Sequence, residues 1–219
     1  MKFVNLHTHH FTDSEQVFEV VNQYPHAFDA AVENYSVGIH PWYIEIERVT
    51  LDMKFIEKKI QSKNCLAVGE CGLDKRIEFP FDFQVEVFER QLRLAQQYRK
   101  PVIVHCVAAF QELVEIKNRL KIDVPMIVHG FAKKIDLAHQ LLDNGFYLSF
   151  GKYLLRNPEL ESVFAAIPED RFFLETDSIE ESITEVYDRA SNSRGITVGE
   201  TKAIIARNFK AVFKTDFTE

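Results

Sequence analysis

Side chains that bind metals or move protons stand directly after several short apolar runs in this sequence. Histidines follow "FVNL", "PVIV" and "PMIV", and carboxylates follow "LAVG" and "FFLET". Four imidazoles and two carboxylates, with no thiolate among them, suit borderline divalent ions. We expect zinc first, with manganese, magnesium, nickel or iron as alternatives. The candidate ligands are His7, His9, Glu70, His105, His129 and Asp177.

Six ligands are more than one tetrahedral zinc ion takes. They suit two ions that share a bridging carboxylate, an arrangement that holds both the attacking and the leaving oxygen in phosphoryl hydrolysis. His7 and His9 stand two residues apart, so both point to one side of an extended strand and could grip one ion. The residue types therefore predict a two-metal hydrolytic site.

Short β-rich runs that alternate with longer amphipathic segments must position these ligands. Several runs are apolar without alternation, as in strands buried on both faces of a parallel sheet. A closed barrel and an open doubly wound sheet both fit this order. In a barrel the carboxyl ends of all strands converge on one face, whereas an open sheet spreads them along a line, so we expect an α/β fold of the TIM-like (β/α) barrel type. The strand candidates are residues 2–6, 35–39, 65–69, 101–105, 125–129, 146–150 and 171–175.

Helices are expected in the gaps between the strands. Residues 83–100 carry one apolar stripe against a charged face, which predicts an amphipathic helix. Thr197 with Glu200, and Ser178 with Glu181, have the spacing of a capping box and predict two helix starts. The stripe consists of Val85, Phe88, Leu92, Ala95 and Tyr98.

Composition limits the setting. A chain of 219 residues that is 46% hydrophobic can bury a full core, and we expect a single domain over residues 1–219. The net charge of -7 gives no chain-wide electrostatic case for nucleic-acid binding. Three cysteines without a Cys-x-x-Cys pair favour a reducing cytoplasm. No apolar run approaches the roughly 20 residues that span a bilayer, so we expect no membrane association, and no obligate protein partner is inferred.

The strings "NLHTHH", "GIHPW", "AVGECGLDK", "VHGF" and "LETDS" occur in this order along the chain. Together they resemble the TatD family of metal-dependent deoxyribonucleases, of which this chain would be a short, divergent member. The resemblance implies an amidohydrolase-like TIM barrel, two divalent ions, and hydrolysis of phosphodiesters, often from DNA ends.

The resemblance also implies a role for each matching residue. Asp177 lies beside the attacking water and accepts its proton, Glu70 bridges the ions, and His40 faces the substrate, so these three are the expected catalytic residues. The implied ligands are His7, His9 and Asp177 for the first ion, and His105 and His129 for the second, with Glu70 shared.

Three departures from the family pattern affect the expected site. Asn5 stands where the family usually has an aspartate, which weakens support for the first ion. Val107 and Ala108 replace an arginine and an aspartate, so a cationic contact to substrate is missing. The loop after Ser178 is cut short, and that loop helps to shape the substrate mouth.

Other cations must then hold a phosphate. Lys75 in "GLDK" and Lys152 in "SFGK" lie closest in sequence to the motifs and are the expected substrate-binding residues, with Trp42 as a wall of the pocket. The wider set of cations after predicted strands is Lys75, Arg76, Lys133, Lys134, Lys152 and Arg156.

Three functions remain open from the sequence. The first is a two-metal phosphodiesterase that acts on a phosphodiester substrate such as a DNA end. The second is a metal-dependent hydrolase of a small ester, lactone or amide, because barrels reuse one metal site for many substrates. The third is a metal-binding protein with little turnover.

Overall fold

The computed structural model describes residues 1–215 of the chain. The predicted domain ends at residue 219, outside the described residues, and the single-domain organisation stays a prediction. The strands are β1 (Phe3–Thr8), β2 (Val17–Gln23), β3 (Tyr35–Val37), β4 (Cys65–Asp74), β5 (Val102–Val107), β6 (Met126–Val128), β7 (Phe146–Phe150) and β8 (Phe172–Leu174).

Eight α-helices and three short 3-10 helices connect the described strands. The α-helices are α1 (Val49–Lys59), α2 (Phe81–Tyr98), α3 (Phe110–Leu120), α4 (Ile135–Asp143), α5 (Lys152–Arg156), α6 (Glu159–Ala166), α7 (Ile183–Arg194) and α8 (Val198–Phe213). The 3-10 helices are η1 (Pro25–Ala27), η2 (Pro41–Tyr43) and η3 (Glu169–Arg171).

The strands follow one another in sequence order, β1-β2-β3-β4-β5-β6-β7-β8, in one sheet. The pairs β1–β2, β3–β4, β4–β5 and β7–β8 are parallel. The chain after β8 returns to β1, where Thr8 and Asp177 form a parallel bridge. A strand order that returns to its first strand is that of a closed (β/α) barrel. The predicted fold class is therefore confirmed.

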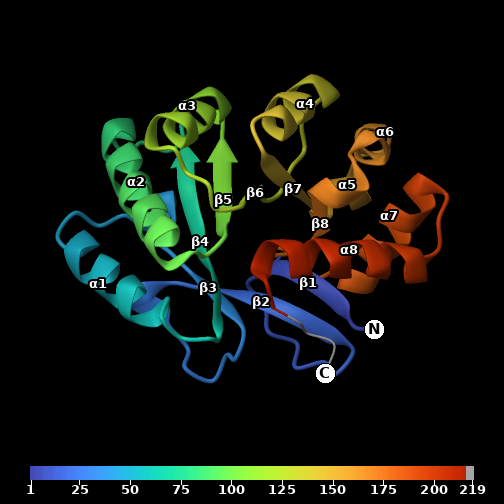
Figure 1. Cartoon of the computed structure of the whole chain (residues 1–219), viewed down its shortest axis with the longest axis horizontal. Coiled ribbons are helices and arrows are strands. Elements are labelled where there is room, and N and C mark those ends of the chain that lie inside the picture. The colour runs from blue at the N-terminus through green and yellow to red at the C-terminus, as the bar shows by residue number, and fades with distance from the viewer. Residues whose placement is uncertain (216–219) are drawn as a thin grey trace. The chain divides into compact units, whose positions relative to one another are not determined.

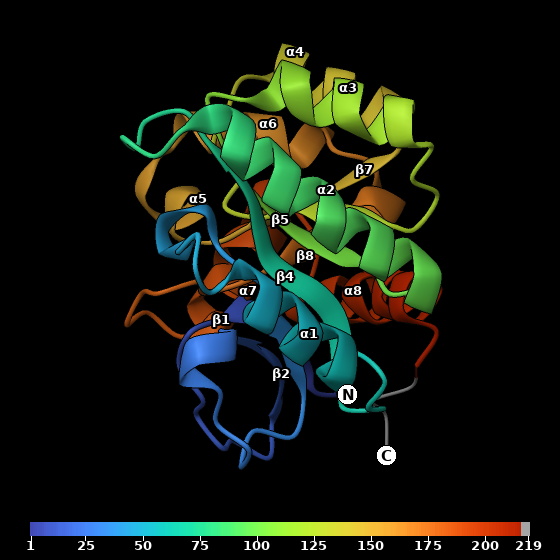
Figure 2. The same cartoon turned by 90° about the vertical axis from the view of Figure 1, so that its left-hand side faces the viewer.

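The chain divides into two compact units. The central unit is Asn22–Ile127, and the terminal unit is Met1–Val21 together with the chain from Val128 onward. In the central unit β4 pairs with β3 and β5, α2 packs on β4, and α1 contacts α2 (Figure 2). In the terminal unit β8 pairs with β7 and contacts β1, while α8 packs on both β8 and β1 (Figure 1).

Two glycines let β4 approach β5 closely. A Cβ on Gly69 would meet the Ile103 carbonyl oxygen at 2.7 Å, and one on Gly72 would meet the His105 oxygen at 1.9 Å. Their φ angles of +151° and +154° are also rare for residues with a side chain. Glycine is therefore required on both sides of Glu70, and the close approach places the last residues of β4 beside His105.

Helix α2 buries two glutamines that the apolar stripe did not predict. Phe88, Leu92 and Ala95 are buried as expected, but Val85 and Tyr98 are only half-buried. Gln84 and Gln91 take buried positions because each hydrogen-bonds the backbone at the end of a strand. The helix therefore contributes polar clamps as well as apolar packing.

Two sequence-based expectations about elements were wrong or incomplete. Strand β2 was missed, because its run "VFEVVNQ" is interrupted by Glu19, a buried carboxylate that accepts hydrogen bonds from the backbone N–H and hydroxyl of Thr12. The helix start at Ser178 was wrong: the N-cap of α7 is Ser182, four residues later, which forms a capping box with Glu185. The capping box of Thr197 and Glu200 is confirmed at the start of α8.

Within residues 1–215, no helix is both long enough and apolar enough to cross a membrane.

Candidate metal centre

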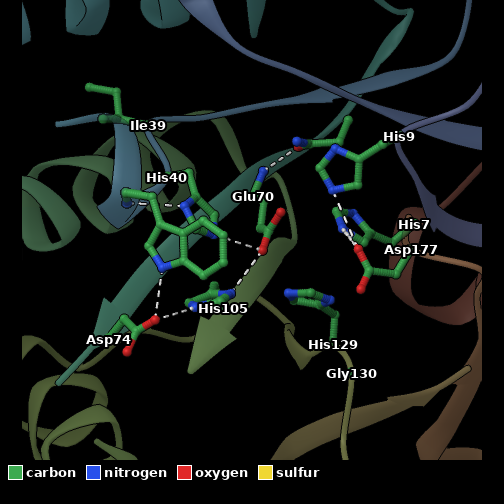
Figure 3. A network of polar contacts seen from close by, with 12 residues as sticks. His7, His9, Ile39, His40, Glu70, Asp74, His105, His129, Gly130 and Asp177 are labelled. Atoms are coloured by element: carbon green, nitrogen blue, oxygen red, sulfur yellow. Dashed lines mark hydrogen bonds and ion pairs between the residues drawn. The ribbon is translucent and has the colours of Figure 1, made fainter. Parts of the chain in front are cut away.

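The terminal unit gathers four of the predicted ligands, which we call the terminal cluster: His7, His9, His129 and Asp177 (Figure 3). The ligand atoms of His7, His129 and Asp177 all lie within 4.8 Å of one another. His9 joins them through its Nε2 atom, 3.4 Å from Asp177 Oδ1. His7 is fully buried, whereas His9 and Asp177 are partly open to solvent. This arrangement offers three imidazoles and one carboxylate to an ion.

Backbone pairing fixes Asp177 against β1. The N–H of Asp177 donates to the carbonyl of His7 at 2.9 Å, and the N–H of His9 donates to the carbonyl of Asp177 at 2.9 Å. Asp177 has a φ of +57°, in the left-handed region, which aspartate tolerates better than most residues. The carboxylate of Asp177 is thus presented next to His7 of β1 and to His9, which follows the strand, by a backbone that pairs with this segment.

A buried carboxylate supports His129. Glu175 Oε1 lies 3.5 Å from His129 Nδ1 and accepts a hydrogen bond of 2.6 Å from the backbone N–H of Gly130. Glu175 is fully buried, so its orientation is fixed by these contacts. A carboxylate beside a ligating imidazole orients the ring and sets which nitrogen carries the proton.

A cavity of about 840 Å³ opens beside Lys152, whose Nζ lies 3.4 Å from Asp177 Oδ2. Its lining includes Tyr153, which is 43% exposed, and Arg156, which forms an ion pair of 2.6 Å with Glu181. Lys152, a predicted substrate-binding residue, therefore lies at the terminal cluster.

The central unit holds a second group, the central cluster: His40, Glu70 and His105 (Figure 3). Their ligand atoms also lie within 4.8 Å of one another. Glu70 Oε1 stands 3.1 Å from His40 Nε2 and 3.0 Å from His105 Nδ1. His40 and Glu70 are buried. One carboxylate oxygen thus lies between two imidazoles.

Three buried amides hold the backbone that carries the central cluster. Asn22 Oδ1 accepts from the N–H of Glu70 at 2.6 Å. Gln91 accepts from the N–H of Ile39 at 2.7 Å and donates to its carbonyl at 3.1 Å, next to His40. Gln84 makes the same paired contact with the backbone of Asp74. These amides therefore fix the backbone of Glu70 itself, of Ile39 directly before His40, and of Asp74 at the end of β4.

Asp74 is a further carboxylate at this cluster, and it was not predicted from the sequence. Its Oδ2 atom lies 3.3 Å from His105 Nε2 and accepts a hydrogen bond of 2.8 Å from the indole N–H of Trp42. Burial raises the pKa of Asp74, but the hydrogen bonds from Trp42, the backbone of Arg76 and His105 outweigh it, and the net pKa lies below its usual value. Asp74 therefore stays ionised beside His105. Its position four residues after Glu70 was the available sequence signal.

The remaining predicted substrate residues and departures have defined surroundings. Lys75 forms an ion pair with Glu112 of α3. Trp42 is 58% exposed while its indole N–H is bound to Asp74. Asn5 is buried and joins β1 to the end of β8, because its amide donates to the Thr176 hydroxyl and accepts from the Thr176 N–H.

Both donor sets fit divalent ions of the zinc and manganese kind, because each combines imidazole nitrogens with a carboxylate. The resemblance assigned His129 to the same ion as His105. In the structure His129 lies with His7 and Asp177. Which ion each histidine holds stays a prediction.

Comparison with known proteins identifies the family. The family described as TatD related DNase matches residues 1–214. This chain belongs to the TatD family.

Individual TatD-family relatives agree with that assignment. A metal-dependent hydrolase of Haemophilus influenzae is 31% identical over 153 residues, covering 66% of this chain and 58% of its own length. The 3'-5' ssDNA/RNA exonuclease TatD of Edwardsiella piscicida is 30% identical, covering 76% of this chain and 64% of its own length. The chain thus matches less than two thirds of the length of these relatives.

Solved structures show the same fold. The crystal structure of YjjV, a TatD homologue from Escherichia coli K12, matches with a TM-score of 0.83 and 20% identity, covering 97% of this chain and 98% of YjjV.

Proposed function

We propose that this chain is a metal-dependent hydrolase that cleaves phosphodiester bonds with two divalent ions. The observation that carries the proposal is the pair of clusters, each made of histidines and a carboxylate at the carboxyl ends of strands. Membership of the TatD family supports the same reaction. Glu70 is the proposed shared ligand, as the resemblance to the TatD family implies.

Bound divalent ions would polarise the phosphoryl oxygens and lower the pKa of water. Asp177 is the proposed proton acceptor, because its carboxylate stands beside His9 and Lys152 and is still partly open to solvent. Lys152 would leave Asp177 for a non-bridging phosphate oxygen when substrate binds, since their ion pair is long, at 3.4 Å, and partly open to solvent.

His40 is proposed to donate a hydrogen bond to the substrate. Its Nδ1 atom accepts from the backbone N–H of Trp42 at 3.1 Å, so the proton of a neutral His40 ring lies on Nε2. That N–H points to Glu70 Oε1 in this structure. A ring held in this tautomer is better suited to donate to a phosphate oxygen than to ligate an ion through Nε2.

The proposed substrate is the end of a single-stranded nucleic acid. The name of the Edwardsiella relative supports this choice. The cavity beside Lys152 adds an exposed aromatic ring, Tyr153, on which a base could stack, and Arg156 for a neighbouring phosphate. Lys75 and Trp42 are the proposed substrate contacts next to the central cluster.

Zinc is the proposed ion, with manganese, magnesium, nickel or iron as alternatives. A reducing cytoplasm is the proposed setting, and the three free cysteines support it.

A small ester, lactone or amide is the second candidate substrate. Both cations of the cavity are already paired with carboxylates, Lys152 with Asp177 and Arg156 with Glu181, and Glu180 also lines it. These carboxylates would oppose a polyanion more strongly than a small neutral ester.

The substrate experiment compares the two candidates directly. Purified protein with added zinc, manganese or magnesium is given single-stranded DNA labelled at one end, bis(p-nitrophenyl) phosphate, and p-nitrophenyl acetate. We expect metal-dependent cleavage of the two phosphodiesters. Cleavage of the acetate alone would favour the second candidate, and metal binding without turnover on any substrate would favour a binding protein.

A further inference from the structure

We propose that Asp74 is a positioning residue that fixes the His105 ring so that its Nδ1 atom, beside Glu70, is the nitrogen that faces an ion. The inference rests on the proposed metal centre. It concerns a carboxylate that has no metal-ligand role in the site described above.

The two nitrogens of His105 face different carboxylates. Nε2 lies 3.3 Å from Asp74 Oδ2, and Nδ1 lies 3.0 Å from Glu70 Oε1. His105 and Glu70 would hold an ion with the His105 Nδ1 atom free of its proton. The ring would then keep one N–H, on Nε2, and donate it to Asp74. A carboxylate that holds the far nitrogen in this way fixes the ring plane and raises the basicity of the ligating nitrogen.

Asp74 is itself held from several directions, which a solvated surface carboxylate would not be. It is 2% exposed. Oδ2 accepts the Trp42 indole N–H at 2.8 Å, and Oδ1 accepts the Arg76 backbone N–H at 2.8 Å. The paired contacts of Gln84 fix its backbone N–H and carbonyl. The carboxylate therefore cannot turn away from His105 without breaking a bond to Trp42 or to Arg76.

In the terminal cluster the carboxylate lies beside the other nitrogen of the supported histidine. Glu175 lies next to Nδ1 of His129, at 3.5 Å, which leaves Nε2 of that ring for an ion. One histidine in each cluster is thus paired with a buried carboxylate, and the pairing selects Nδ1 in His105 and Nε2 in His129. The position of each carboxylate therefore decides which ring nitrogen is left for an ion.

Asp74→Asn tests the role with little change of size. Asparagine has one acceptor oxygen, so its NH2 group must face either the Arg76 N–H or the N–H groups of Trp42 and His105. Zinc is titrated into metal-free protein in competition with a chromophoric chelator, which yields the affinity and number of bound equivalents. We expect one equivalent to bind 10- to 100-fold more weakly than in wild type, with the other unchanged.

Asp123→Asn is the matched control, because Asp123 is an exposed carboxylate of the central unit that forms an ion pair with Arg99 on the surface. It should bind zinc as wild type does. Wild-type affinity for both equivalents in Asp74→Asn would overturn the inference while leaving the metal centre intact. Failure of the wild type to bind zinc would instead overturn the proposed function, and this inference with it.

A second variant and a second readout decide the matter if Asp74→Asn does not fold. Trp42→Phe keeps an aromatic ring and removes the N–H that holds Asp74, so a weakening of the same zinc equivalent, smaller than 10-fold, is expected; an unchanged affinity would overturn the inference. In zinc-loaded protein with 15N-labelled histidine, NMR should show His105 protonated on Nε2, the signal being assigned with a His105→Gln variant. Protonation on Nδ1 would contradict the proposed geometry.

Discussion

Gly72 is the position at which one added methyl group should separate the ligands of the central cluster. A Cβ at Gly72 would stand 1.9 Å from the carbonyl oxygen of His105, and real Cβ atoms essentially never approach another atom within 3.0 Å. Gly72→Ala must therefore move β4 from β5 by about 1 Å, because the obstructing atom is backbone. The φ of +154° adds strain, since alanine rarely adopts it.

Such a shift carries Glu70 and Asp74 away from His105 together. We expect the free energy of unfolding to fall by about 3 kcal/mol or more, the range of severe backbone substitutions. Turnover should fall about 100-fold, since a misplacement of 1 Å can cost that much. The assays are urea unfolding followed by circular dichroism, and hydrolysis of bis(p-nitrophenyl) phosphate with added zinc.

Gly199→Ala is the matched control for the same substitution. Gly199 lies in the first turn of α8, and the nearest atom to an added Cβ is the Thr197 hydroxyl at 3.8 Å. Alanine there should leave turnover unchanged and stabilise the protein by up to about 1 kcal/mol. Wild-type stability and turnover in Gly72→Ala would refute the claim that the close approach of β4 and β5 builds the central cluster.

Three further predictions address other parts of the chain. Asp177→Asn should lower phosphodiester turnover by about 10²- to 10⁴-fold, measured with bis(p-nitrophenyl) phosphate, while the ion of the central cluster stays bound. An unchanged rate would rule out Asp177 as the base. His10→Asn is the control and should change turnover little, because His10 is exposed. Tyr187→Phe removes a buried hydroxyl that bonds both the N–H and the carbonyl of Val4, and should cost about 1–3 kcal/mol in urea unfolding; no loss would mean that water replaces it. Burial raises the pKa of Cys65 to about 12, and the nearby Lys100 partly opposes this shift. An unfolded cysteine thiol has a pKa of about 8.5, so the unfolded state ionises first as the pH rises. The free energy of unfolding should therefore fall as the pH rises above about 8.5. Cys65→Ala should reduce that slope, and an equal slope would contradict the assignment.

The sequence predicted which metal-binding side chains gather where these side chains stand at or directly after the end of a strand. His7, His9 and Asp177 were predicted as ligands from their positions after apolar runs, and the structure places them in one cluster. The apolar run of β5, Val102 to Val104, was read as a strand buried on both faces, and these residues are fully buried. Both predictions of position agree with the structure because they depend on local sequence pattern. The order of apolar and polar residues within one short run indicates both the strand and its burial.

Contacts between distant residues could not be read in the same way. Asp74 stands at the right spacing after Glu70, but its role depends on Trp42, which lies 32 positions away in the chain. Gln84 and Gln91 look like the polar face of α2 until the strand ends that they bind are known. Buried polar side chains in this protein are specified by their partners, and the partners come from the tertiary fold.

Local signals also competed with one another. The pattern Ser-x-x-Glu occurs at residues 178–181 and again at 182–185, and only the second starts a helix. Ser178 follows Asp177, whose backbone pairs with β1, so the chain at Ser178 is still tied to this pairing and the helix begins later. The start of α7 therefore depends on the pairing with β1. That pairing joins residues far apart in the chain and cannot be predicted from the residues around Ser178.

Removal and return of metal tests the central claim most directly. Protein freed of metal with a chelator is assayed on bis(p-nitrophenyl) phosphate, then titrated with zinc or manganese while turnover and bound metal are measured in the same sample. We predict no turnover without metal, and full turnover when two ions are bound per chain. Wild-type turnover in metal-free protein, or full turnover with no more than one ion bound at saturating metal, would contradict the proposed two-metal mechanism.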